Sequence, residues 1–104
     1  MVLARIVRFH FKKGKREESF ADLDLILNNQ ARNARGFRGF ISLLSKNSEN
    51  EAVILTLWTD ERSLLASETE ILSFAVAKIL NALEKEPVVE HFGVFSTAMF
   101  LREI

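Results

Sequence analysis

Two kinds of hydrophobic pattern run along the chain, and they predict different elements. Residues 2–11 are rich in Val, Ile and Phe and are followed by a Lys-Lys-Gly turn, which is typical of a β-strand. In residues 15–35, apolar side chains recur with the 3.6-residue period of a helix. Gly36 predicts the end of this helix, because glycine readily adopts the left-handed conformation found there. The residues of the helical stripe are Phe20, Leu23, Leu27, Ala31 and Ala34.

The second half of the chain predicts a hairpin, two helices and a closing strand. Residues 37–46 and 51–59 are β-rich runs joined by a short polar connection, which is typical of a hairpin. Asp60 is a suitable N-cap for a short helix over residues 61–66. The sequence Ser67-Glu-Thr-Glu has the form of a capping box, so we expect a new helix from Ser67 to about residue 85, before Pro87. Residues 88–101 contain no proline and predict one long strand.

The predicted order of elements is β-α-β-β-α-β. In a single domain of 104 residues, this order is typical of the ferredoxin-like α+β sandwich. We therefore expect a four-stranded antiparallel sheet that carries both helices on one face.

Both faces of the predicted strands are apolar, which a single sandwich does not explain. A sheet face in contact with water should be polar, whereas helices can cover only one face here. A second copy of the chain is the simplest cover, because homodimers are the commonest oligomers. We predict a homodimer joined through the helix-free face, with the end of the last strand reaching the partner. The opposed apolar sets are Val53, Leu55 and Leu57 against Ala52, Ile54 and Trp58, then Phe92, Val94 and Phe100 against Val89, Phe95 and Met99.

Composition narrows the possible chemistry. The chain is 48% hydrophobic and 27% charged, as expected of a soluble globular domain. It has no cysteine and two distant histidines, which argues against a protein-bound metal. Residues 1–11 are interrupted by Arg5 and Arg8 and do not resemble a signal peptide, and no apolar run is long enough to span a membrane. We therefore predict a cytoplasmic protein with no membrane contact.

Residues 35–41, Arg-Gly-Phe-Arg-Gly-Phe-Ile, are superficially similar to a signature of the RNA-recognition motif, which shares the βαββαβ order. Their spacing differs by one residue, and the run lies on the second strand instead of the third. The zero net charge also argues against RNA binding. We therefore expect no nucleic-acid partner.

The chain resembles the antibiotic biosynthesis monooxygenase-type domain of the dimeric α+β barrel superfamily. The resemblance covers nearly the whole chain. It rests on the helix that opens after Lys-Gly-Lys at residues 13–15, on the run at residues 35–40, and on Leu-Thr-Leu-Trp-Thr-Asp at residues 55–60 with Ser63 following. It implies a dimeric barrel with a cavity between the sheet and helices of each subunit. Relatives include cofactor-independent oxygenases of quinol- and anthrone-like aromatics, quinol oxidases and haem-degrading enzymes.

The chain departs from the family's best-known patterns at several positions. Anthrone oxygenases place an Asn four residues before the strand Trp, where this chain has Ile54. Many members have a His in the short helix that follows, and this chain has none there. Haem-degrading relatives have an Asn on the first strand and a His on the last helix, whereas this chain has Val7 and no His between residues 68 and 85. We therefore expect neither haem nor any other cofactor.

The resemblance implies a cofactor-independent monooxygenase or quinol oxidase acting on a small planar aromatic. The alternative is a non-catalytic small-molecule-binding or structural homodimer, because a fold does not fix a function. His91 is the predicted general base, because histidine titrates near neutral pH, and Arg8 is the second catalytic candidate. Trp58, Phe40 and Arg5 are the predicted substrate contacts.

Each candidate also has a structural interpretation. Trp58 could be a core residue with a partner for its ring N–H, and His91 could be a hydrogen-bonded structural histidine. Arg5 and Arg8 could be rim charges or intersubunit ion pairs. His10 lies beside Lys12 and Lys13 and is expected to be exposed.

Overall fold

The computed structural model describes residues 1–98 and has the predicted βαββαβ order. The strands are β1 (Leu3–His10), β2 (Phe37–Leu44), β3 (Glu51–Trp58) and β4 (Val88–Gly93). The α-helices are α1 (Arg16–Asn29), α2 (Glu61–Ser67) and α3 (Ser73–Ile79). A π-helical turn at Glu68–Leu72 joins α2 to α3, and 3-10 turns follow α1 and α3 at Ala31–Asn33 and Leu80–Ala82.

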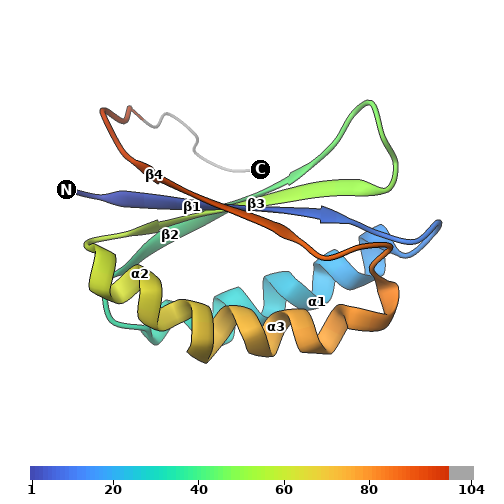
Figure 1. The fold of residues 1–104 in the computed structure, drawn as a ribbon, viewed down its shortest axis with the longest axis horizontal. Helices are drawn as coiled ribbons and strands as arrows, with labels where there is room; N and C mark the ends of the chain where they lie inside the picture. Colours follow the sequence, from blue (N-terminus) through green and yellow to red (C-terminus); the bar gives the residue numbers. More distant parts are fainter. Residues whose placement is uncertain (99–104) are drawn as a thin grey trace.

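The four strands form one antiparallel sheet in the order β2-β3-β1-β4. Figure 1 shows α1, α2 and α3 on the same side of this sheet. The observed architecture is the ferredoxin-like sandwich that the sequence predicts. It places β4 at an edge of the sheet, next to β1.

Alternation along β1 divides its side chains between the two faces, because successive residues of a strand point in opposite directions. Val7 and Phe9 face the helices and are buried, and Phe11 continues this side beyond the strand. They pack with Phe20 of α1, whose ring makes edge contacts with both phenylalanine rings. Burying one side chain of this size contributes about 1.5–3 kcal/mol. The core therefore lies between the sheet and the helices.

The opposite face of the sheet is largely apolar. None of the helices in the described part of the chain, residues 1–98, covers it (Figure 1). We call it the open face. Its apolar residues fall into two groups that differ in exposure. Ile6, Ile41, Val53, Leu55 and Leu57 are half-buried, whereas Leu43, Val88 and Phe92 are 49%, 52% and 45% exposed. The two-faced apolarity of the strands is therefore a property of the folded chain.

The last strand is shorter than the sequence predicts. It ends at Gly93, and residues 94–98 have no regular secondary structure. The neighbouring strand β1 begins at Leu3. The Val94 N–H donates to the Val2 carbonyl at 2.9 Å, and beyond this bond β1 offers β4 no further residues to pair with. Met99, Phe100 and Leu101 of the predicted strand lie outside the described residues.

Asp60 caps α2 as expected, whereas Ser67 does not begin a new helix. Asp60 Oδ1 accepts from the Ser63 N–H at 2.8 Å, and this bond to the backbone lowers the pKa of the Asp60 carboxyl. Ser67 has helical dihedral angles, and its hydroxyl donates to the Leu64 carbonyl at 2.6 Å. The helix therefore continues through the π-helical turn at Glu68–Leu72 into α3. Its last turn ends at Ala82, earlier than predicted.

Candidate functional site

Arg5 is buried between the sheet and the helices, with 2% of its surface exposed. Its Nη1 donates to Ser67 Oγ at 2.6 Å and to the Leu64 carbonyl at 3.2 Å, whereas its Nε has no hydrogen-bond partner. Among residues 1–98, no carboxylate forms an ion pair with it. Burial lowers the pKa of the Arg5 guanidinium, and the nearby Glu68 carboxylate opposes this effect. Arginine stays protonated even so, which leaves a buried cation without a counter-charge in contact.

A small cavity lies beside Arg5, inside the helix–sheet layer. Its volume is about 30 Å³, which is room for one water molecule. Arg5 and Thr56 are its only polar lining residues, because every other wall is a hydrocarbon or aromatic side chain. Those walls are Val7, Phe9, Leu23, Leu27, Ile54, Ile71, Leu72 and Ala75. The arrangement is an apolar hole with one cation at its edge.

Trp58, one of the predicted substrate contacts, lies against Arg5 and is not among the residues that line the cavity. The indole is 1% exposed, and its Nε1 donates to Thr56 Oγ1 at 2.9 Å. The guanidinium carbon of Arg5 lies 5.4 Å from the centre of the Trp58 ring, within the range of a cation–π contact. Trp58 therefore combines a core position with a direct contact to the buried cation.

Phe40 lies on the helix-facing side of β2, in register with Thr56. Its ring stacks on Phe37 with centroids 6.4 Å apart, and Phe37 in turn makes an edge contact with Trp58. Phe40 is partly buried against the core and is not among the residues that line the cavity. It belongs to the aromatic cluster behind the site.

His91 faces the helix side of the sheet, directly beside Arg5 in the β1–β4 register. Its Nε2 is hydrogen-bonded to Glu68 Oε1, and its side chain is 41% exposed. Its apolar neighbours along the strand do not bury it, because β4 is an edge strand and Val89 and Phe92 are 41% and 45% exposed. His91 thus stands at the rim of the helix–sheet layer, where solvent reaches it.

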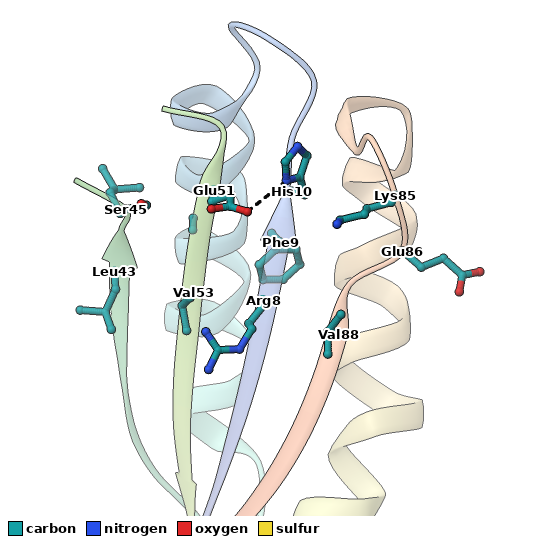
Figure 2. Close-up of a pocket in the computed structure, with 12 residues that line it drawn as sticks. Arg8, Phe9, His10, Leu43, Ser45, Glu51, Val53, Lys85, Glu86 and Val88 are labelled. Carbon is teal, nitrogen blue, oxygen red and sulfur yellow. Dashed lines mark hydrogen bonds and ion pairs between the residues drawn. The ribbon is translucent and has the colours of Figure 1, made fainter. Parts of the chain in front are cut away.

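Arg8 lies on the open face, on the opposite side of the sheet from Arg5. Its Nε donates to Glu90 at 3.1 Å, and its side chain is 56% exposed. It lines a groove of about 400 Å³ at one end of the open face, shown in Figure 2. His10 lies at the end of this groove and is hydrogen-bonded to Glu51, while Lys85 points toward it. Arg8 and His10 are therefore separated from the cavity by the sheet itself.

The sequence interpretation missed three residues of the site. Ser67 is predicted as the first residue of a capping box, Glu68 lies between it and the box's Glu70 without a role, and Thr56 is not singled out. A weak signal existed for Thr56, which is a polar residue among the helix-facing positions Ile54 and Trp58.

None of the helices in residues 1–98 has the length and apolar character that a membrane crossing requires.

Comparison with known proteins shows the fold. No protein-family model matches the chain, and no curated protein matches it significantly. A solved structure from Mycobacterium tuberculosis superposes with a TM-score of 0.79 at 19% identity, covering 95% of this chain and 100% of that one. A Nitrosomonas europaea protein described as a putative antibiotic biosynthesis monooxygenase gives a TM-score of 0.78 at 16% identity, covering 90% of both chains. A Bordetella bronchiseptica protein with the same description gives 0.78 at 12% identity, covering 91% of this chain and 98% of that one.

These similarities confirm that the chain has the fold of the antibiotic biosynthesis monooxygenases, as the sequence resemblance predicted. At such identities the likeness concerns the fold alone. What the site does must be argued from Arg5 and the residues around it.

Proposed function

We propose that this protein is a cofactor-independent monooxygenase or quinol oxidase that binds a small planar aromatic as its anion. The observation that carries the proposal is Arg5, a buried guanidinium at the edge of an apolar cavity, to which residues 1–98 offer no carboxylate in contact and no hydrogen-bond partner for Nε. An aromatic anion supplies both the missing negative charge and the apolar surface that fits such a wall. The descriptions of several proteins with this fold as monooxygenases support the same reaction class.

In the proposed mechanism, His91 accepts the hydroxyl proton of the aromatic, and Arg5 holds the anion that remains. The His91 Nε2 is occupied by Glu68, so Nδ1 is the atom that takes the proton. Glu68 then stabilises the charged imidazolium, and the Trp58 ring holds the guanidinium in place. The electron-rich anion reacts directly with dioxygen. A quinol thereby gives a quinone and hydrogen peroxide. An anthrone-type CH2 group instead becomes a carbonyl: its carbon keeps one oxygen atom, and its two hydrogens leave with the other oxygen atom as water.

We further propose a cytoplasmic homodimer joined through the open face. The exposed and half-buried apolar side chains on this face form a patch of the kind that soluble monomers rarely expose. Packing two such faces together forms the barrel implied by the family resemblance. In this arrangement, Arg8 and Glu90 lie within the intersubunit contact, so Arg8 contributes to assembly and has no catalytic part in the cavity of its own subunit.

One observation favours the alternative, a non-catalytic small-molecule-binding or structural homodimer, in its structural form. The cavity of about 30 Å³ holds a water molecule and no aromatic ring unless Leu and Ile side chains move. A cavity filled in this way is expected of a purely structural domain. The two candidates therefore differ in whether the cavity opens to admit an aromatic.

Oxygen consumption with 1,4-naphthohydroquinone distinguishes the two candidates, once the protein-free rate of autoxidation is subtracted. The proposed enzyme accelerates oxygen uptake in proportion to its concentration and produces naphthoquinone. Arg5→Met loses this acceleration, while the matched variant Arg8→Met keeps it, because Arg8 lies on the other face. Equal rates with and without wild-type protein, together with no binding of 1-naphthol, would support the structural homodimer.

A further inference from the structure

The cavity beside Arg5 and a larger groove outside the helix layer share one wall residue, Leu72. The outer groove has a volume of about 390 Å³ and is mainly apolar. Leu72 is half-buried and is the only residue that lines both spaces. Val76, one helical turn further on, lines the outer groove alone. The other residues of the outer groove are Ser73, Ala77, Leu80, Pro87 and Val89.

We call the boundary between α3 and β4 the seam, and we expect it to open more easily than the rest of the helix–sheet layer. β4 is an edge strand, so no further strand holds it from outside. Among residues 1–98, the side-chain hydrogen bond that joins β4 to the helix layer is His91 to Glu68. Beyond that bond, Leu72, Val76 and Val89 line the groove along this seam, and their apolar side chains form no directional bonds.

The backbone conformation at Leu72 is a second reason to expect opening at this point. Leu72 is the last residue of the π-helical turn, in which the Ser73 N–H bonds to the Glu68 carbonyl five residues earlier. Single π-helical turns inside α-helices are uncommon and are frequent at functional sites. This turn places Leu72 at the junction of the two spaces.

We propose that the aromatic ligand reaches Arg5 from the outer groove, with Leu72 as the gate and as the residue that sets the largest ligand admitted. The inference rests on the proposed function for the identity of the ligand. The apolar groove favours the neutral form of the aromatic during passage, because an anion would lose its hydration there. The hydroxyl then ionises beside His91 and Arg5, at the inner end of the route.

Stopped-flow binding of 1-naphthol tests the gate. Leu72→Ala should raise both the association and the dissociation rate about fivefold or more, because a gate slows passage in both directions. The dissociation constant should change less than either rate. Leu72→Phe should slow both rates, whereas Leu65→Ala should leave them unchanged, because Leu65 is exposed on α2 and lines neither space. Circular dichroism confirms that each variant has the wild-type helix and strand content.

A second measurement does not depend on the proposed function. Trp58 is the only tryptophan, so acrylamide quenching of its fluorescence reports how easily a small neutral molecule reaches the Arg5 region. Leu72→Ala should raise the Stern–Volmer constant about twofold or more by opening the cavity, and Leu65→Ala, on the exposed side of α2, should not.

The two measurements separate the access route from the function. If 1-naphthol does not bind while quenching depends on Leu72, the route stands and the proposed function fails. If 1-naphthol binds, but its rates and the quenching are the same in wild type and Leu72→Ala, the route is wrong and the function stands.

Discussion

Arg5 Nη1 donates to Ser67 Oγ at 2.6 Å, which ties the middle of the sheet to the end of α2. The same hydroxyl donates to the Leu64 carbonyl at 2.6 Å. Ser67 therefore joins Arg5 and the Leu64 carbonyl in one hydrogen-bond network. Arg5 also lines the cavity, and its Nε has no hydrogen-bond partner among residues 1–98. Ser67 is therefore a positioning residue for the proposed anion site.

Ser67→Ala should weaken binding of an aromatic anion and destabilise the fold. The loss leaves the buried Arg5 Nη1 with one partner fewer, which costs about 1–3 kcal/mol in the free energy of unfolding. Urea denaturation measures the stability, and titration with 1-naphthol measures the affinity. Ser67→Thr keeps the hydroxyl and should restore most of both. A similar loss in the Thr and Ala variants would show that the hydroxyl is not what matters.

His91→Gln should abolish oxygen uptake with 1,4-naphthohydroquinone while leaving the protein folded. Gln can still hydrogen-bond to Glu68, but it cannot take the substrate proton at neutral pH. The matched control is His10→Gln, because His10 lies on the opposite face and pairs with Glu51. Full activity in the His91 variant would remove this residue from the mechanism and leave the substrate to lose its proton to solvent.

Leu55→Asp should convert the dimer into monomers. Leu55 lies near the centre of the open face, paired with Ile6 and Ile41, and a carboxylate there would be buried without a partner in the dimer. Sedimentation equilibrium should give twice the subunit mass of 11.9 kDa for the wild type. Leu65→Asp is the control, because Leu65 is already 46% exposed on α2. A wild-type protein that sediments as a monomer at micromolar concentration would contradict the barrel.

Asp60 should make the stability of the fold depend on pH below neutrality. Its pKa in the folded protein is lowered, chiefly by the hydrogen bond from the Ser63 N–H. A lowered folded pKa means that the stabilisation is present above the unfolded value, near 3.9, and is lost as the pH falls through the folded pKa. Asp60→Asn should keep the cap and remove this part of the acid sensitivity, whereas Asp60→Ala should lower the melting temperature at neutral pH. Thermal melts between pH 2 and 7 check both expectations.

Local patterns were enough to predict the layers and the faces of this protein. Arg5 and Arg8 are three residues apart in β1 and lie on opposite faces, as the alternation of a strand requires, and the apolar stripe of α1 is the side that packs on the sheet. The burial of Arg5 could not be predicted, because it depends on Ser67 and Leu64, about sixty residues away. The exposure of His91 depends on β4 being an edge strand, which is a matter of strand order and not of local sequence.

The capping-box interpretation at Ser67 shows why spacing alone was insufficient. Ser-x-x-Glu predicts the start of a helix only where the backbone N–H groups around the serine have no helical partners of their own. Here α2 already runs into Ser67, so its hydroxyl is free to bond to Leu64 and Arg5. In this protein the serine of the motif therefore holds Arg5 in place and does not begin a helix.

The central claim is that Arg5 binds an aromatic anion, and titration with 4-nitrophenol tests it most directly. Its hydroxyl ionises near neutral pH, so both forms can be compared without denaturing the protein. We expect the wild type to bind the ionised form about tenfold or more tightly than the neutral form, as a contact with a buried guanidinium should add at least about 1.4 kcal/mol. Arg5→Met should lose this preference while Arg8→Met keeps it. Equal affinity of the wild type for the two forms, or an unchanged preference in Arg5→Met, would contradict the account.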